Sequence, residues 1–437
     1  MQSLNRNGSP PVRLPWLAAL CLVASAIVLA SIHSVGDQPQ LAVAAYIGLS
    51  VSALVGIAAL WRRDDSAALL LLIVVAVVAR APFLLKQPFL STDAYRYLWD
   101  GRELLNGLNP YVVAPDNPML HWLRLDWLYQ YIYWHWAPSI YPPLDLALFA
   151  IADKLDNSGL LGIKTLVEIG DLGALWLLVL ALRQRGVPAG RAALYGWSPL
   201  VILEFAWSGH EEAWCVAALL AAIYIYDRGG RLGSALALAA AVLVKLYPLA
   251  LIPAFFPRQA AWKWAGACFG IVVLAYVPFV LWDPNVFGFL SAFVTGYHQN
   301  DTLHLILGTR VCAAVFAACV AIAFYARTRG ADLVATTALV VLAYLLLTPS
   351  VYPWYITVFA ALLPLIPGVF SGQLRPVMIG LVCWLSFGIL GYAAEASLAA
   401  HVAEYAPLFV GLAIVGMQGA ERLLAAPPVR ALAADAD

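Results

Sequence analysis

The sequence contains little charge, and none of its cysteines is placed like a metal ligand. Of 437 residues, 25 are Lys or Arg and 25 are Asp or Glu, so the formal net charge is zero. Proteins that bind nucleic acid carry an excess of basic residues, so we expect no nucleic-acid partner. The six cysteines all lie in apolar runs without a CxxC pair, which predicts neither a disulfide nor a metal site.

Apolar residues make up 63% of the chain and fill repeated long runs. A helix that crosses a bilayer needs about 20 such residues, so the pattern predicts an all-α integral membrane protein with about twelve transmembrane helices. The predicted spans are 15–33, 41–61, 66–85, 160–182, 192–207, 211–227, 263–282, 302–325, 332–349, 354–371, 376–395 and 405–423. We expect the first to be an uncleaved helix, because it lacks a small-residue cleavage site.

The stretch 232–257 is too long for one helix and too short for two. Lys245-Leu-Tyr-Pro248 interrupts it, and basic residues flank both of its ends. We predict a pair of short re-entrant helices that enter and leave on the same side. Broken backbone of this kind is tolerated at membrane depth only where it is buried in protein or lines a cavity.

The arginines and lysines predict the topology. If the N-terminus is cytoplasmic, alternate short loops carry most of the basic residues, as the positive-inside rule requires. Both termini are then cytoplasmic, and the long loop 86–159 lies outside. We divide the chain into two added helices in 1–65, a membrane core in 66–371, C-terminal helices in 372–424 and a disordered tail in 425–437.

The segment Ser91–Tyr111, STDAYRYLWDGRELLNGLNPY, is the most highly charged part of the loop 86–159. Asp93, Arg96, Asp100 and Glu103 follow helical spacing and would lie on one face, opposite an apolar face. This pattern predicts a short interfacial helix that presents its charges to a cavity. The alternative is a solvated amphipathic helix with Asp93 as its N-cap.

Several motifs resemble those of a known superfamily. Asp93-Ala-Tyr-Arg96-Tyr-Leu-Trp-Asp100-Gly-Arg102, Gly107-Leu-Asn109-Pro110 and Tyr141-Pro142-Pro143 resemble the first outer loop of polyprenol-phosphate-mannose-dependent α-mannosyltransferases, which belong to the glycosyltransferase C superfamily. Trp207-Ser-Gly-His210, Lys245-Leu-Tyr-Pro248 and Pro349-Ser-Val-Tyr-Pro353-Trp354-Tyr355 resemble later segments of the same group.

The resemblance implies a multi-pass enzyme of the plasma or inner membrane. Such an enzyme transfers one sugar, here mannose, from a polyprenyl phosphate to a glycan or lipid-linked acceptor at the outer face, with inversion. It also implies an acidic general base at the start of the first outer loop, which corresponds to Asp93. The lipid-linked sugar is then a substrate, and we expect no cofactor and no metal, since His210-Glu211-Glu212 lacks the HExxH spacing.

Transfer from a phosphate needs a base for the acceptor hydroxyl and cations for the charge that develops on the leaving group. Candidate contacts to the donor phosphate or sugar are Arg96, Arg102, Lys245, His298, Asn300 and Arg310. Further candidate substrate contacts are Asp100, Tyr141, His210, Glu211, Glu212, Tyr352, Trp354 and Tyr355.

Several residues have a purely structural alternative. Lys245 is equally consistent with snorkelling or with an ion pair to Glu204. Lys164, Glu168 and Asp171 follow helical spacing and favour an internal ion-pair face. The dense aromatic residues of 118–136 suit either the lipid headgroup level or stacking on sugars.

Two other functions stay open at the level of sequence. One is transport or flipping of a lipid-linked saccharide, although transporters tend to contain internal repeats and none is found here. The other is a glycan polymerase or ligase that uses a pyrophosphate-linked donor.

Overall fold

The computed structural model describes residues 13–33, 36–258, 261–300, 303–366, 369–370, 373–393 and 398–425. The predicted tail lies outside these residues except for Ala425. The chain forms two compact units, residues 1–366 and 367–437.

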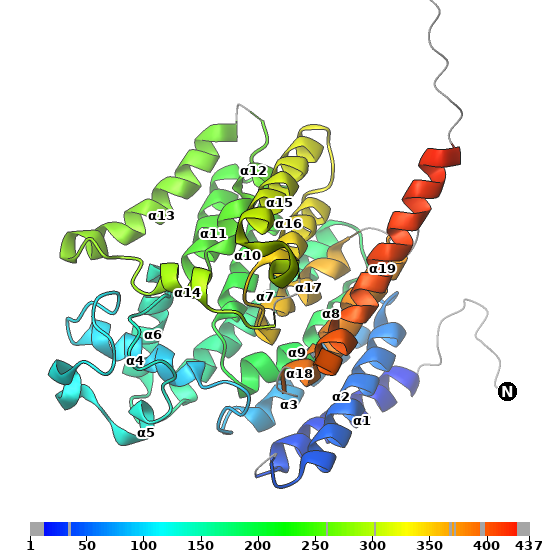
Figure 1. Ribbon diagram of the computed structural model, residues 1–437. Helices are drawn as coiled ribbons and strands as arrows, with labels where there is room; N and C mark the ends of the chain where they lie inside the picture. Colours follow the sequence, from blue (N-terminus) through cyan, green and yellow to red (C-terminus); the bar gives the residue numbers. More distant parts are fainter. Residues whose placement is uncertain are drawn as a thin grey trace, which may run out of the picture. The chain divides into compact units, whose positions relative to one another are not determined.

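The regular secondary structure of the described residues is helical (Figure 1), apart from an isolated parallel bridge between Gln299 and Ser350. In unit 1 the α-helices are α1 (Arg13–Ser31), α2 (Pro39–Leu60), α3 (Ser66–Arg80), α4 (Asp93–Leu105), α5 (Asp126–Tyr129), α6 (Pro143–Leu155), α7 (Leu161–Gln184), α8 (Ala193–Gly196), α9 (Pro199–Ile202), α10 (Glu212–Asp227), α11 (Arg231–Val244), α12 (Ile252–Phe255), α13 (Trp262–Trp282), α14 (Leu290–Gly296), α15 (Leu303–Thr328), α16 (Leu333–Leu347) and α17 (Pro353–Leu362). Unit 2 contains α18 (Arg375–Ala393) and α19 (Leu398–Ala425). The predicted all-α class is confirmed.

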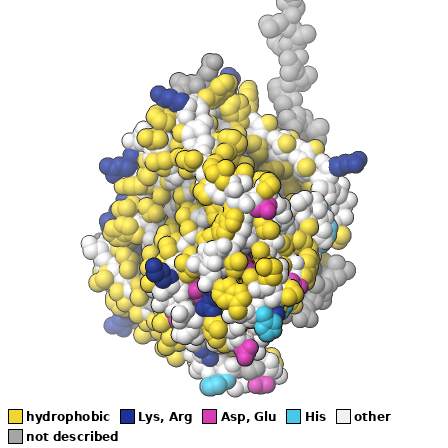
Figure 2. Space-filling model, turned by 90° about the vertical axis from the view of Figure 1, so that its left-hand side faces the viewer, with side chains coloured by type: hydrophobic (Ala, Val, Ile, Leu, Met, Phe, Trp, Pro, Cys, Tyr) yellow, Lys and Arg dark blue, Asp and Glu magenta, His cyan; other side chains and the backbone are white. Residues whose placement is uncertain are grey.

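Six helices of the described chain are long and apolar enough to cross a membrane. They are α1, α2, α3 with the turn after it, α7, α13 and α15, and each coincides with a predicted span. Figure 2 shows hydrophobic side chains over most of one face, with Lys and Arg mainly near its outline and His and acidic groups toward its lower end. These features are those of a membrane protein, while the full number of spans stays a prediction.

The predicted span 192–207 is wrong as a single helix. The structure divides it into α8, α9 and a π-helical turn, η4 (Leu203–Trp207). Pro199 explains the first break, because proline excludes the helical conformation for the residue before it, and Ser198 is extended with φ −60° and ψ 123°.

The predicted interruption of 232–257 is confirmed, but the two parts are unequal. The 14-residue helix α11 ends at Val244, and Lys245 is extended with φ −143° and ψ 134°. A 3-10 turn, η5 (Tyr247–Leu251), and the single turn α12 follow. Pro248 lacks the N–H that a continuous helix needs there, which accounts for the break. Whether the chain leaves on the side where it entered stays a prediction.

Helix α4 is not the solvated amphipathic helix of the alternative interpretation. Its residues from Ala94 to Glu103 are all buried, and it packs along α6. Both of its arginines pair with acids inside the protein: Arg96 Nε donates to Asp100 Oδ1 at 2.6 Å, and Arg102 Nη2 donates to Asp153 Oδ1 at 2.6 Å. Pairing inside the protein removes the reason for these side chains to face solvent.

A buried polar network on α7 anchors the start of the loop 86–159. Arg80 Nε lies 2.5 Å from Asp171 Oδ2 and 3.7 Å from Glu168 Oε2. Lys164 Nζ donates to the backbone oxygens of Phe83, at 3.0 Å, and Lys86. The expected internal ion-pair face is therefore confirmed for the two acids, whereas Lys164 binds backbone and fixes where the loop begins.

Unit 2 consists of α18 packed against α19. A Cβ added at Gly380 would lie 2.6 Å from Leu408 Cα, so this glycine allows close contact of the two helices. Trp384 Nε1 donates to Glu404 Oε1 at 2.8 Å in their buried interface. This hydrogen bond satisfies a polar pair in an otherwise apolar contact.

Candidate active site

Asp93 is the first residue of α4 and is mostly buried. Thr92 occupies the cap position, so the interpretation of Asp93 as the N-cap is wrong. The Asp93 N–H donates to Ser91 Oγ at 3.2 Å. Burial raises the pKa of the Asp93 carboxyl, while His210 and Lys245 act against this rise. Arg96 is not among the groups that act against this rise, because its guanidinium is paired with Asp100.

Lys245 lies in the break between α11 and η5 and forms ion pairs with two carboxylates. Its Nζ is 3.1 Å from Glu211 Oε1 and also contacts Glu212 Oε1. The ammonium lies 4.2 Å from the centre of the Tyr355 ring, a cation–π contact. The alternative pairing with Glu204 is wrong.

His210 is fully buried between an acid and an aromatic ring. Its Nδ1 lies 2.9 Å from Glu204 Oε2, and its ring stacks on Trp354 with centroids 3.7 Å apart. Burial alone would lower the pKa of His210, but Glu204 and the nearby Asp93 outweigh it and raise that pKa. Trp354 in turn stacks on Tyr352 at 4.7 Å.

Glu211 connects these groups to α4. Its second carboxylate oxygen accepts a hydrogen bond from the Tyr97 hydroxyl, while the first faces Lys245. Tyr97 also packs edge-on against Tyr141 at 5.1 Å. The structure therefore gathers α4, the start of α10, the break after α11 and the start of α17 into one polar cluster.

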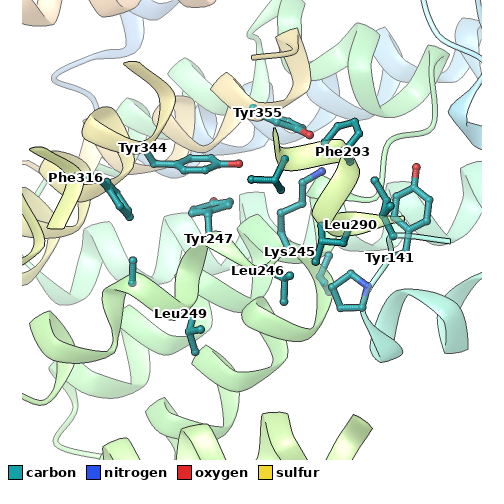
Figure 3. Close-up of a pocket in the computed structure, with 15 residues that line it drawn as sticks. Tyr141, Lys245, Leu246, Tyr247, Leu249, Leu290, Phe293, Phe316, Tyr344 and Tyr355 are labelled. Carbon is teal, nitrogen blue, oxygen red and sulfur yellow. The ribbon is translucent and has the colours of Figure 1, made fainter. Parts of the chain in front are cut away.

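An apolar cavity of about 480 Å³ adjoins this cluster. Figure 3 shows Lys245 with its amino group directed toward Tyr355 and Phe293, and Tyr247 facing Tyr344 to one side. Tyr141 lines the cavity as well, and most of the remaining lining is aliphatic. The cavity thus has a hydrophobic body with one ammonium group, and that group is already paired with carboxylates.

Two of the arginines that the sequence analysis gave as candidate donor contacts lie elsewhere in the structure. Arg102 lies with Asp153 at a second cavity, toward the C-terminal end of α4. Arg310 is exposed in the first turns of α15.

His298 and Asn300 belong to a segment that pairs with the strand-like residues before Tyr352. Gln299 N–H donates to Pro349 O at 3.0 Å, and Val351 N–H donates to Gln299 O at 2.8 Å. Two segments far apart in the chain are therefore neighbours.

Asp145 is a residue that the sequence analysis missed. It lies in the first turn of α6, is fully buried, and neither carboxylate oxygen has a hydrogen-bond partner among the described residues. Burial raises the pKa of Asp145 well above its ordinary value, and Glu211 adds to the rise. Its position two residues after Tyr141-Pro142-Pro143 was the available signal, although an acid in a first helical turn is ordinarily explained by the helix dipole.

No group of three or more His, Cys, Asp or Glu side chains in the part of the chain that the structure describes is arranged to hold a metal ion. The six cysteines are free thiols. The polar side chains described in the cluster are carboxylates, one lysine, one histidine and tyrosine hydroxyls.

The helical membrane fold and this polar cluster beside an apolar cavity fit a membrane glycosyltransferase of the superfamily C type. The chain belongs to the family described as alpha-(1->6)-mannopyranosyltransferase, N-terminal domain, whose model matches residues 10–264. The resemblance drawn from the motifs and the prediction of a glycosyltransferase are confirmed.

A curated relative supports the same assignment. Alpha-(1->6)-mannopyranosyltransferase B of Corynebacterium glutamicum is 25% identical over 160 residues, which is 34% of this chain. The match covers 25% of the length of that relative.

Proposed function

We propose that this protein transfers a single mannose from a polyprenyl-phosphate-linked donor to a glycan or lipid-linked acceptor at the outer face of the membrane. The observation that carries the proposal is Lys245, a largely buried cation that lines an apolar cavity and acts electrostatically on the carboxylate of Asp93. An isoprenoid phosphate has the same division into an apolar chain and an anionic head. The α-(1→6) linkage in the name of the curated relative is the linkage we propose here.

In the proposed reaction, the acceptor hydroxyl oxygen attacks the anomeric carbon of the mannose. The bond from that carbon to the phosphate oxygen breaks, and polyprenyl phosphate leaves with the electron pair. Asp93 accepts the hydroxyl proton, and the configuration at the anomeric carbon is inverted. Phosphate is a good leaving group, so one base suffices where a glycosidase needs a carboxylate pair.

The phosphate must compete for Lys245 with two carboxylates. Glu211 and Glu212 surround the ammonium, and Asp145 adds a third acid nearby. An additional anion is accommodated only if one of these acids is neutral, because like charges in a buried site repel strongly. The burial that raises the pKa of Asp145 favours its neutral form, and displacement of Glu212 from Lys245 would free the cation for the phosphate.

The test is transfer of radiolabelled mannose from polyprenyl-phosphate-mannose to an α-mannoside acceptor by purified protein in proteoliposomes. We expect a labelled, elongated product, and we expect transfer to continue in EDTA because the proposed step uses no metal. Label that moves across the bilayer without joining the acceptor would favour the flippase. Product formed only from a pyrophosphate-linked donor would favour a polymerase or ligase.

A further inference from the structure

A second cavity of about 380 Å³ lies apart from the one beside Lys245. Its polar lining is Arg102, Asn106, Asp153 and Asn157, and Trp122 adds an aromatic ring that is 64% exposed. The volume falls in the range of small-molecule sites, about 300–1,000 Å³. No step of the proposed transfer uses these residues.

The cavity lies at one end of a rigid pair of helices. Tyr97 stacks on Phe149 at 4.5 Å, and Arg102 pairs with Asp153, so residue numbers rise together along α4 and α6 and the helices are parallel. Their N-terminal ends carry Asp93 and Asp145, whereas the second cavity lies at their C-terminal ends. Nine residues of α4 separate Asp93 from Arg102, or about 14 Å along the axis.

The electrostatics of this end favour a neutral ligand over an anion. The Arg102 guanidinium is neutralised by Asp153 at 2.6 Å and also donates to the Asn157 backbone oxygen at 3.1 Å. The C-terminal ends of two helices add partial negative charge from their last carbonyl groups. A lipid phosphate would meet no unpaired cation here.

The polar groups that remain are suited to hydroxyls. Asn106 Nδ2 donates to Arg102 O at 2.8 Å, which leaves the Asn106 amide oxygen as an acceptor. The Asp153 carboxylate and the Asn157 amide offer further acceptors and donors, and a sugar hydroxyl can both donate and accept. The exposed ring of Trp122 provides an apolar face for a pyranose ring.

We propose that this cavity binds a neutral oligosaccharide, the part of the glycan acceptor that lies several sugar units away from the reacting hydroxyl. The inference rests on the proposed function for the identity of the acceptor. Nine helical residues also turn Arg102 to the opposite face of α4 from Asp93, so only an extended acceptor reaches both places. The site therefore discriminates acceptors by length.

The test compares transfer to a dimannoside and to an octamannoside, both α-(1→6)-linked, in wild-type protein and Trp122→Ala. Loss of ring stacking should raise the KM for the octamannoside by about 3- to 10-fold and leave the KM for the dimannoside unchanged. Tyr133→Ala is the matched control, because Tyr133 is an aromatic residue of the same loop, 71% exposed, outside the cavity. It should change neither KM.

Calorimetric titration of octamannoside into the Asp93→Asn protein separates this inference from the proposed function. Binding that Trp122→Ala weakens would support the site even if polyprenyl-phosphate-mannose proved not to be the donor. The site would be overturned, and the proposed function left standing, if the wild-type protein transferred mannose but Trp122→Ala did not change the affinity for the octamannoside. If Trp122→Ala instead weakened the binding of soluble short-chain phosphatidylglycerol to the detergent-solubilised protein, the cavity would be a lipid site and the inference would be overturned.

Discussion

At the scale of single residues, the site contains more acid than base. Lys245 is paired with both Glu211 and Glu212, and Asp93 and Asp145 lie within electrostatic reach. Such a site is poorly disposed to an anion until a carboxylate moves or takes up a proton. In the proposed mechanism, donor binding is therefore coupled to the displacement or protonation of a carboxylate.

Replacement of Lys245 tests its part in holding the donor. In Lys245→Met we expect the KM for polyprenyl-phosphate-mannose to rise at least about 10-fold, because the phosphate loses its buried cation. The change also strands two carboxylates, which can destabilise a buried cluster by about 3–5 kcal/mol. Lys245→Met with Glu212→Gln is the matched variant, since it removes one stranded charge. Unchanged KM and turnover in both variants would show that Lys245 is a structural ion-pair partner.

His210 tests the electrostatics around the proposed base. Asp93 must be ionised to accept a proton, and burial raises its pKa, so kcat/KM should fall as pH decreases through a value above the ordinary carboxylate range. Protonated His210 opposes that rise. His210→Gln should therefore move the acidic limb of the pH profile to higher pH, whatever happens to the maximal rate. An acidic limb that stays in place or moves to lower pH contradicts this arrangement.

The sequence located several residues of the cluster but not their partners. Asp93, His210 and Lys245 were recognisable because polar residues stand out in apolar surroundings and match family motifs. The pairing of Lys245 with Glu211 and Glu212 depends on how the start of α10 meets the break after α11, which local spacing does not contain. Asp145 was missed because its significance lies in its burial and in the lack of a partner for its oxygens.

At the scale of elements, the parallel pair α4 and α6 connects the candidate active site to the second cavity. Helical periodicity predicted α4, but it left open a solvated helix, because four regularly spaced charges resemble a solvated face. The failure at 192–207 has a similar origin. An apolar run long enough to span a membrane gives no sign of the π-helical turn at η4, and Pro199 was the only local warning.

Gly101 tests the closeness of this helix pair. A Cβ at Gly101 would lie 2.3 Å from the backbone C and O of Phe149, so α4 and α6 would have to move apart. Gly101→Ala should lower the free energy of unfolding by about 1–3 kcal/mol, read as a lower melting temperature. Gly173→Ala in α7 is the control, because its added Cβ meets nothing within 4 Å. Equal melting temperatures for the two variants would contradict the close packing.

At the scale of the whole molecule, the composition alone predicted a helical membrane protein, and six long apolar helices agree with it. A helical chain that crosses a lipid bilayer must form long apolar helices, because its backbone polar groups have to be paired internally. These helices are therefore predicted without knowledge of tertiary contacts. Sidedness has a different physical basis, the distribution of Arg and Lys between loops, and it needs its own experiment.

Cysteine labelling of intact cells tests that sidedness. In a background with the six native cysteines replaced, a membrane-impermeant reagent should label Asp116→Cys in the loop 86–159 and not Gln184→Cys at the end of α7. Both positions are exposed, so accessibility within the protein does not decide the result. Labelling of Gln184→Cys alone would reverse the topology and place the candidate active site on the cytoplasmic side.

In the proposed mechanism, Asp93 is the base of a mannosyl transfer. The single-turnover rates of Asp93→Asn and Asp100→Asn test this role. Asparagine preserves the shape of Asp93 but not its basicity, and general-base help is typically worth about 10²- to 10⁴-fold. We predict normal folding and donor binding with a rate at least about 10²-fold lower for Asp93→Asn, and a smaller loss for Asp100→Asn, whose carboxylate is paired with Arg96. Near-normal transfer by Asp93→Asn together with loss in Asp100→Asn would move the base to Asp100, and activity in both would contradict the mechanism.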